Sequence, residues 1–155
     1  HADVYAGGFL MIGGCTHVIA VEDAKFGLPE VKRGIFPFQV MATLEPLMSA
    51  RQLLDLCIRA KTLTAKEAKE IGLVSEVVAT NNLENRVQAL IAEIKEQSPT
   101  AIRLGLKAYH EMKTKNADEK HKYLHAMLMQ CLQSKDAAEG LTAFKEKRKP
   151  NWSGN

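Results

Sequence analysis

Glu30 is the side chain whose surroundings most favour acid–base chemistry. It follows Pro29 in the stretch FGLPEVKRGIFPF, residues 26–38, where aromatic and aliphatic residues stand on both sides of it. Such neighbours remove water from a carboxylate and favour its protonated form, which brings proton exchange toward neutral pH. The alternative is a surface glutamate in a turn, and the residues alone weigh the two interpretations equally.

A second candidate is the backbone of AGGFLMIGG, residues 6–14. Gly7 and Gly8 open this apolar stretch, and Gly13 and Gly14 close it. Glycine inside a helix or strand costs about 0.5–1 kcal/mol relative to alanine, so each pair requires a reason. The candidate reasons are a tight turn, the close approach of two backbones, or a ligand that reaches bare N–H groups.

Two further patterns favour plainer interpretations. His121 and His125 have the i, i+4 spacing of a shared metal ion, but no glutamate stands between them and no third ligand is evident. We therefore predict a solvated helix face and no metal. The basic end FKEKRKP, residues 144–150, is typical of a solvated helix terminus, and its functional alternative has Lys147 contacting phosphate groups.

The elements that must position these residues change in character along the chain. A β-branched segment predicts a strand over 17–21, and a polar turn leads to an extended piece at 25–26. From Val40 onward nearly every segment has helical signals, so a small α/β start is followed by an array of helices. A short buried strand is predicted over 73–78. The predicted helix that begins at Thr64 ends at Gly72, and the one that begins at Ser134 ends at Pro150. The other predicted helices begin at Ser49, at Leu83 and at Ser98 with Pro99, and one more lies within 118–133; the pairs Ser49/Gln52 and Thr64/Glu67 fit a capping box.

Composition bounds the class of protein. The chain has 155 residues, 46% of them hydrophobic and 25% charged, which is typical of one globular core. The net charge of +3 suits an anionic small molecule as well as RNA. Three widely spaced cysteines favour a reducing compartment, and no apolar run reaches the ~20 residues of a membrane span. We expect no secretory signal, and a start at His1 instead of methionine indicates a piece of a longer protein.

Four motifs, in order, resemble the crotonase (enoyl-CoA hydratase/isomerase) superfamily. The first is the long stretch YAGGFLMIGGCTHVIAVEDAKFGLPEVKRGIFP, which is similar to the family's glycine-rich turn, helix, strand and FGxPE segment. The others are TLTAKEAKEIGLVSEVV, SPTAIRLGLK and AFKEKRKPNW. Together they cover almost the whole chain, and the resemblance begins midway through the family pattern.

The resemblance implies an α/β fold: residues 1–80 form the C-terminal part of a crotonase-like spiral of ββα units, and residues 81–155 form helices that assemble trimers and cover CoA. The implied substrate is an acyl-CoA thioester, with no separate cofactor because CoA belongs to the substrate. A homotrimer or dimer of trimers is the expected assembly, nucleic acid is not an expected partner, and no membrane span is expected. The expected location is the cytoplasm, or the mitochondrial or peroxisomal matrix in a eukaryote.

The resemblance also assigns roles to residues. The backbone N–H of Gly7 matches a donor to the thioester oxygen, and the helix begun at Gly8 aims its positive pole at the same atom. Glu30 matches the family's acid/base glutamate. Substrate-binding positions are Gly8, Leu10, Pro29 and Phe38, together with Phe144 and Lys147, which match family positions that meet CoA, often from a neighbouring subunit. Gly13 and Gly14 are expected to let the helix pack on the sheet.

Two departures from the family pattern bear on the reaction. Leu10 stands where hydratases have a second glutamate, and Phe38 and Gln39 replace a pair of glycines, which reshapes the acyl pocket. Syn addition of water is served by two carboxylates, whereas a 1,3-proton shift uses one, so enoyl-CoA isomerisation is favoured over hydration. The alternatives are enoyl-CoA hydratase activity and a non-catalytic family member that binds acyl-CoA, RNA or a protein.

Overall fold

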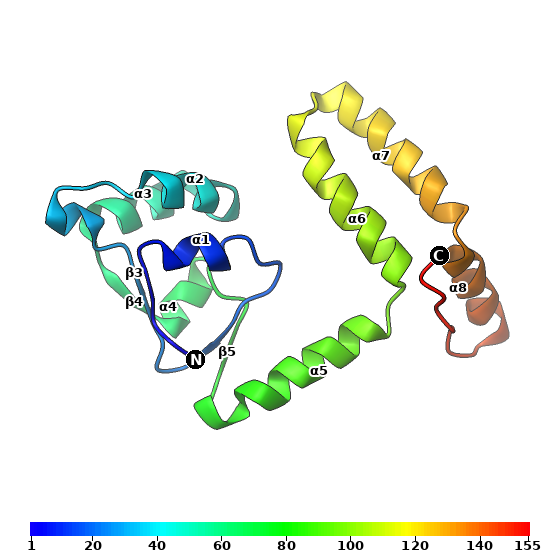
Figure 1. Cartoon of the computed structure of the whole chain (residues 1–155), viewed down its shortest axis with the longest axis horizontal. Coiled ribbons are helices and arrows are strands. Elements are labelled where there is room, and N and C mark those ends of the chain that lie inside the picture. Colours follow the sequence, from blue (N-terminus) through cyan, green and yellow to red (C-terminus); the bar gives the residue numbers. More distant parts are fainter. The chain divides into compact units, whose positions relative to one another are not determined.

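The computed structural model describes residues 1–155 and places them in two compact units, residues 1–89 and 90–155. The first unit holds all five strands and the short helices around them (Figure 1). The second unit is helical. Helix α5 (Leu83–Lys95) begins in the first unit and ends in the second.

Two small sheets organise the first unit. In one, β3 (Lys25–Gly27) lies between β1 (Val4–Tyr5), which is parallel to it, and β4 (Thr62–Thr64), which is antiparallel. In the other, β2 (Ile19–Val21) pairs in parallel with β5 (Glu76–Val78). The strand predicted over 17–21 therefore starts two residues later than expected, and β5 is half-buried and shorter than the predicted strand.

Short helices connect these strands. Helix α1 (Gly8–Ile12) follows β1, and the 3-10 helix η1 (Glu30–Arg33) follows β3. Both predicted capping boxes are confirmed, at Ser49 before α3 and at Thr64 before α4. The remaining elements are α2 (Phe38–Leu44), η2 (Glu45–Leu47), α3 (Ala50–Arg59), α4 (Ala65–Glu70) and η3 (Thr80–Asn82).

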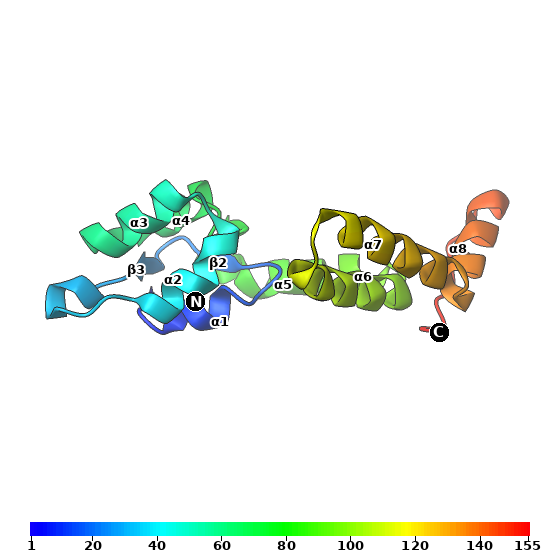
Figure 2. The same ribbon diagram turned by 90° about the horizontal axis from the view of Figure 1, so that it is seen from above.

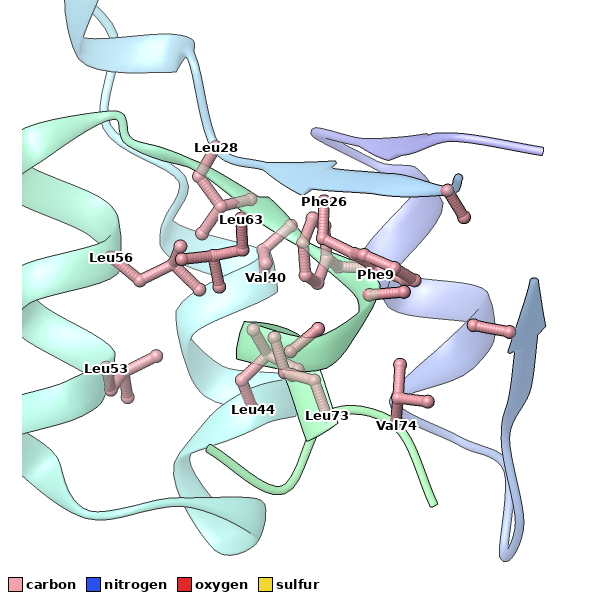
Figure 3. Close-up of a cluster of buried hydrophobic side chains, with 14 of the residues drawn as sticks. Phe9, Phe26, Leu28, Val40, Leu44, Leu53, Leu56, Leu63, Leu73 and Val74 are labelled. Atoms are coloured by element: carbon pink, nitrogen blue, oxygen red, sulfur yellow. The ribbon is translucent and has the colours of Figure 1, made fainter. Parts of the chain in front are cut away.

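The core of the first unit fills the space between the three-stranded sheet and these helices. Phe9 of α1 and Phe26 of β3 lie beside one another at its centre, and both are almost fully buried (Figure 3). Leucines from the loop after β3, from α3 and from β4 close its other side. Phe9 lies in α1, the helix that Gly7 precedes, and Phe26 lies in β3, the strand before the turn of Glu30, so the core fixes both elements.

The second unit is built on an antiparallel helix pair. Helices α6 (Pro99–Glu111) and α7 (Ala117–Leu132) run side by side, joined by η4 (Met112–Thr114), and α8 (Lys135–Glu146) packs against both (Figure 2). The predicted caps Ser98 and Ser134 are confirmed. Helix α8 ends at Glu146, and the next residue, Lys147, has a left-handed conformation, so the helix does not continue to Pro150 as predicted. No helix combines the length and apolarity that crossing a membrane requires.

Candidate active site

The parallel pairing of β1 and β3 brings Gly7 and Glu30 to one edge of the sheet. Val4 pairs with Phe26 and Tyr5 with Gly27, so the two strands end side by side. Gly7 follows the end of β1 by two residues, and Glu30 follows the end of β3 by three. Ligands of open α/β sheets bind outside the carboxyl ends of the strands. This edge is therefore the candidate active site.

Gly7 carries an unused backbone donor. It precedes α1 with φ −57°, and its N–H donates to no carbonyl or side chain, as is expected at a helix start. A Cβ at this position would meet nothing within 4 Å, so neither space nor backbone conformation requires glycine here. The strained residue is instead Ala6, with φ 50°, a conformation that sequence reasoning could not detect because no glycine marks it.

Glu30 opens η1 and is half-buried. Its Oε2 atom is buried and has no hydrogen-bond partner, which is rare for a carboxylate oxygen in a folded protein. Its backbone carbonyl accepts from Ile35, and the turn closes at Gly34 with φ 73°, which only glycine adopts without strain. Oε2 is thus shielded from solvent, which is not typical of an exposed surface glutamate.

The other positions of the first unit that were predicted to bind substrate include apolar and partly exposed side chains. Leu10 lies one helical turn beyond Gly7, where its N–H donates to the Gly7 carbonyl at 3.1 Å, and its side chain remains 44% exposed. Phe38 is 63% exposed at the start of α2, with its ring 5.2 Å from that of Phe36. Pro29 is half-buried immediately before Glu30. The sequence position of a second glutamate is thus occupied by an aliphatic side chain.

Of the other glycines of the opening stretch, Gly13 serves packing, but against α2 and not on the sheet as predicted. A Cβ at Gly13 would lie 2.6 Å from Thr43 Cγ2, so this glycine lets α1 approach α2. Gly14 meets only carbonyl oxygens of its own helix. Gly8 would bring a Cβ to 3.2 Å from Val4. Helix α1 has five residues, so its dipole adds little to the Gly7 N–H itself.

Cys57 is a further titratable residue of the first unit. It is fully buried on α3, which packs against η1. Burial, and then the negative charge of Glu30, raises the pKa of the Cys57 thiol. The thiol is therefore neutral at physiological pH.

Phe144 and Lys147 belong to the second unit and are described there alone. Phe144 is 84% exposed at the end of α8, and Lys147 has φ 55°. His121 and His125 lie on α7, and no group of three or more His, Cys, Asp or Glu side chains is arranged to hold a metal ion.

This fold is that of the crotonase superfamily. An enoyl-CoA hydratase structure from Mycobacterium smegmatis shares the fold at a TM-score of 0.92 and 23% identity, over 98% of this chain and 59% of that one. An enoyl-CoA hydratase structure from Bacillus anthracis is 30% identical with a TM-score of 0.91, covering 99% of this chain and 60% of that one.

Residues 2–155 match the enoyl-CoA hydratase/isomerase family, to which the chain therefore belongs. A probable enoyl-CoA hydratase of Bacillus subtilis is 33% identical over 99% of this chain, and a carnitinyl-CoA dehydratase of Salmonella paratyphi A is 28% identical over 97%. The chain spans 60% and 59% of the lengths of these two relatives.

Proposed function

We propose that the protein containing this chain transforms an acyl-CoA thioester, with the Gly7 N–H stabilising the enolate oxygen and Glu30 moving a proton. One observation carries the proposal. The unused N–H of Gly7 and the unpaired, buried Oε2 of Glu30 stand at the adjacent ends of two paired strands. Both groups lack partners within the chain, and a thioester supplies a partner for each: its oxygen for the N–H, and the acidic carbon–hydrogen bond for the carboxylate.

The chemistry follows from this pair. Glu30, as a carboxylate, removes a proton from a carbon of the acyl group, and the electron pair moves onto the thioester oxygen. A backbone N–H aimed at that oxygen stabilises the developing charge, an effect worth about 3–4 kcal/mol in enzymes where such a donor has been removed. Glu30 then returns the proton to a different carbon, which completes a shift of the double bond.

Leu10 favours isomerisation over hydration within this proposal. Hydration requires a water molecule held and activated on the substrate, and an aliphatic side chain at position 10 neither accepts nor donates a hydrogen bond. Glu30 alone suffices for a proton shift. The relatives named hydratase or dehydratase keep hydration as the alternative.

Parallel assays separate the two reactions. The protein, purified as its host makes it, is given crotonyl-CoA to follow loss of the conjugated double bond, and a 3-enoyl-CoA to follow its appearance. We expect the second reaction to be the faster. Faster hydration of crotonyl-CoA would reverse the preference and leave the acyl-CoA proposal standing.

A non-catalytic acyl-CoA or RNA carrier is the second candidate, favoured by the exposed Leu10 and Phe38 in place of polar and small residues. It predicts binding without turnover, with the same affinity in Glu30→Gln. An RNA-binding form also predicts affinity that falls steeply with salt, because bound cations release counterions from phosphates.

We further propose that Phe144 and Lys147 contact CoA and that the protein forms trimers. The 84% exposure of Phe144 beside a basic helix end supports an intermolecular role for this surface. Light scattering tests the trimer. Loss of acyl-CoA affinity in Lys147→Ala, with the fold intact, tests the contact.

A further inference from the structure

The second unit has an apolar groove that takes no part in the proposed reaction. It lies between the last turn of α5 and the first half of α6, and the C-terminal tail adds one aromatic side chain to it. Its volume is about 690 Å³. Small-molecule sites in proteins have volumes of roughly 300–1,000 Å³ and mostly apolar walls. The apolar lining here consists of Ile94, Pro99, Ile102, Leu106 and Trp152.

The groove follows one face of α6. Pro99, Ile102 and Leu106 are spaced three and four residues apart, so they lie in a row along the helix. From the first to the last they span about 10 Å of the helix axis. Ile102 and Leu106 are 37% and 44% exposed, and Ile94 at the end of α5 is 49% exposed. The apolar surface is therefore a strip, which suits an extended chain better than a compact ring system.

Trp152 is held in place by the protein itself. Its indole N–H donates to the carbonyl oxygen of Glu96 at 2.8 Å. A Cβ at Gly140 would lie 3.2 Å from the indole ring, so the ring packs directly on α8. The next residue of the tail, Ser153, is fixed because its backbone N–H donates to Asp136 at 2.8 Å. The aromatic wall is thus formed before any ligand binds, which lowers the entropy cost of binding.

The polar lining of the groove carries positive charge. It consists of Lys95, Gln97 and Arg103, and no acidic side chain lines the groove. Lys95 is exposed and forms no ion pair. Arg103 donates only to the carbonyl oxygen of Gly154, at 3.4 Å. Two cations without a carboxylate partner, beside an apolar strip, are complementary to an anion that carries an apolar chain.

We propose that this groove binds an amphipathic anion, an alkyl chain that ends in a carboxylate, with the chain along α6 against Trp152 and the carboxylate at Lys95 and Arg103. The inference is independent of the proposed reaction, because Gly7 and Glu30 belong to the first unit. Its tests measure binding and require no turnover. A second copy of the chain seated on the strip would exclude the ligand, and the first test detects that outcome.

Trp152 reports on the ligand directly, because bromine quenches tryptophan fluorescence on contact. Decanoate brominated beside its carboxylate, or at the far end of its chain, is titrated into the protein as its host makes it, with unbrominated decanoate as the reference. Subtraction of the signal of Trp152→Phe isolates the emission of Trp152. We expect at least one brominated probe to quench most of this emission in a saturable way. No quenching by either probe overturns the proposal, and it is the result expected if a second copy covers the groove.

Calorimetry with decanoate tests the charge, and it also covers the case that Trp152→Phe does not fold. We expect Lys95→Gln to weaken binding about two- to fivefold, as is typical for the loss of one exposed ion pair. Lys122→Gln is the matched control, because Lys122 is an exposed and unpaired lysine of α7 outside the groove. Equal affinities in the native protein and both variants overturn the assignment of an anion.

Leu106→Ser tests the apolar strip in the same assay. We expect it to weaken decanoate binding about fivefold or more, because less of the alkyl chain is removed from water. Leu128→Ser, at an exposed leucine of α7 outside the groove, is expected to leave the affinity unchanged. Equal affinities in the two variants, with unchanged thermal unfolding, contradict the strip along α6 as the binding site.

Discussion

The backbone N–H of Ala6 donates a hydrogen bond to the carbonyl oxygen of Gly27 at 3.2 Å, one residue beyond the end of β1. After this bond, the segment that follows β1 turns into α1, and the segment that follows β3 continues to η1. The Gly7 donor and the Glu30 carboxyl group are therefore tied to the same final rung of a parallel ladder. A change that separates these strands displaces the donor and the acid together.

Removal of the Gly7 donor is expected to slow the reaction without unfolding the chain. Gly7→Pro lacks the N–H, and the φ of −57° at this position suits proline. We expect kcat to fall roughly 100-fold or more. Gly7→Ala is the matched control, since it keeps the donor and its Cβ meets no protein atom. Equal losses in both variants, with unchanged thermal unfolding, would argue against the donor.

Glu30→Gln keeps the shape of the side chain and removes its proton transfer. We expect turnover to fall by about 10²–10⁴-fold while acyl-CoA binding, measured by calorimetry, changes little. Glu70→Gln is the control, because Glu70 is an exposed glutamate of α4. Retained turnover in Glu30→Gln would remove Glu30 from the mechanism.

Acid is expected to weaken the first unit through Glu76. Hydrogen bonds from Arg86 and, to a lesser extent, His17 outweigh burial and hold the pKa of Glu76 at about 2. The ordinary value is about 4.3. Because the folded pKa is the lower one, the stabilisation is present above pH 4.3 and is lost as pH falls toward 2.

Urea unfolding of native protein and Glu76→Gln measures this effect. The difference between their unfolding free energies should be largest near neutral pH and shrink below pH 4. A difference that does not vary with pH would mean that Glu76 contributes through packing rather than through its charge.

Lys147 occupies a left-handed conformation that glycine favours, with φ 55° at the end of α8. Lys147→Gly relieves this strain but also adds conformational entropy to the unfolded chain. We expect the free energy of unfolding to rise by about 0.5–1 kcal/mol in this variant. Lys145→Gly, inside the same helix, is expected to lose about 1 kcal/mol. If Lys147 also binds CoA, the stabilised variant binds acyl-CoA more weakly. Denaturant unfolding and calorimetry on one preparation measure both effects.

Asp136 joins the C-terminal tail to the helices of the second unit. Burial works to raise its pKa, but hydrogen bonds from Ser153, Ser98 and Thr100 prevail and hold the pKa below its usual range. Asp136→Ala should release the tail and shift the emission of Trp152, the single tryptophan, to longer wavelength. Asp118→Ala, on an exposed first-turn aspartate of α7, should leave the emission unchanged. Unchanged emission in both variants would mean that other contacts hold the tail.

Local signals explain which elements could be predicted from the sequence. Ser49 and Thr64 each have a glutamine or glutamate three residues on, and a cap of this kind is determined by neighbours in the chain. Strands β1 and β4 have two and three residues, too few for an alternating pattern, and they exist through pairing with β3. The cap Asn116 before α7 was missed although Glu119 completes its capping box.

Some features of the candidate site could likewise be predicted from local sequence, and others depend on tertiary packing. Gly7 and Glu30 are recognisable because their flanking motifs resemble a known family. The burial of Oε2 without a partner follows from tertiary packing, such as that of α3 on η1, across a sequence separation that no local motif spans. The strain at Ala6 was also invisible, because alanine rarely adopts a left-handed conformation.

Thr43 meets the far end of α1 where Gly13 leaves no room for a Cβ. Helix α1, which starts beside the Gly7 donor, therefore packs closely against α2, which starts with Phe38. A bulkier side chain at position 43 would displace both helices at once. Under the proposed function, substrate preference would change through residues outside the pocket lining, and a search for specificity changes confined to that lining would overlook them.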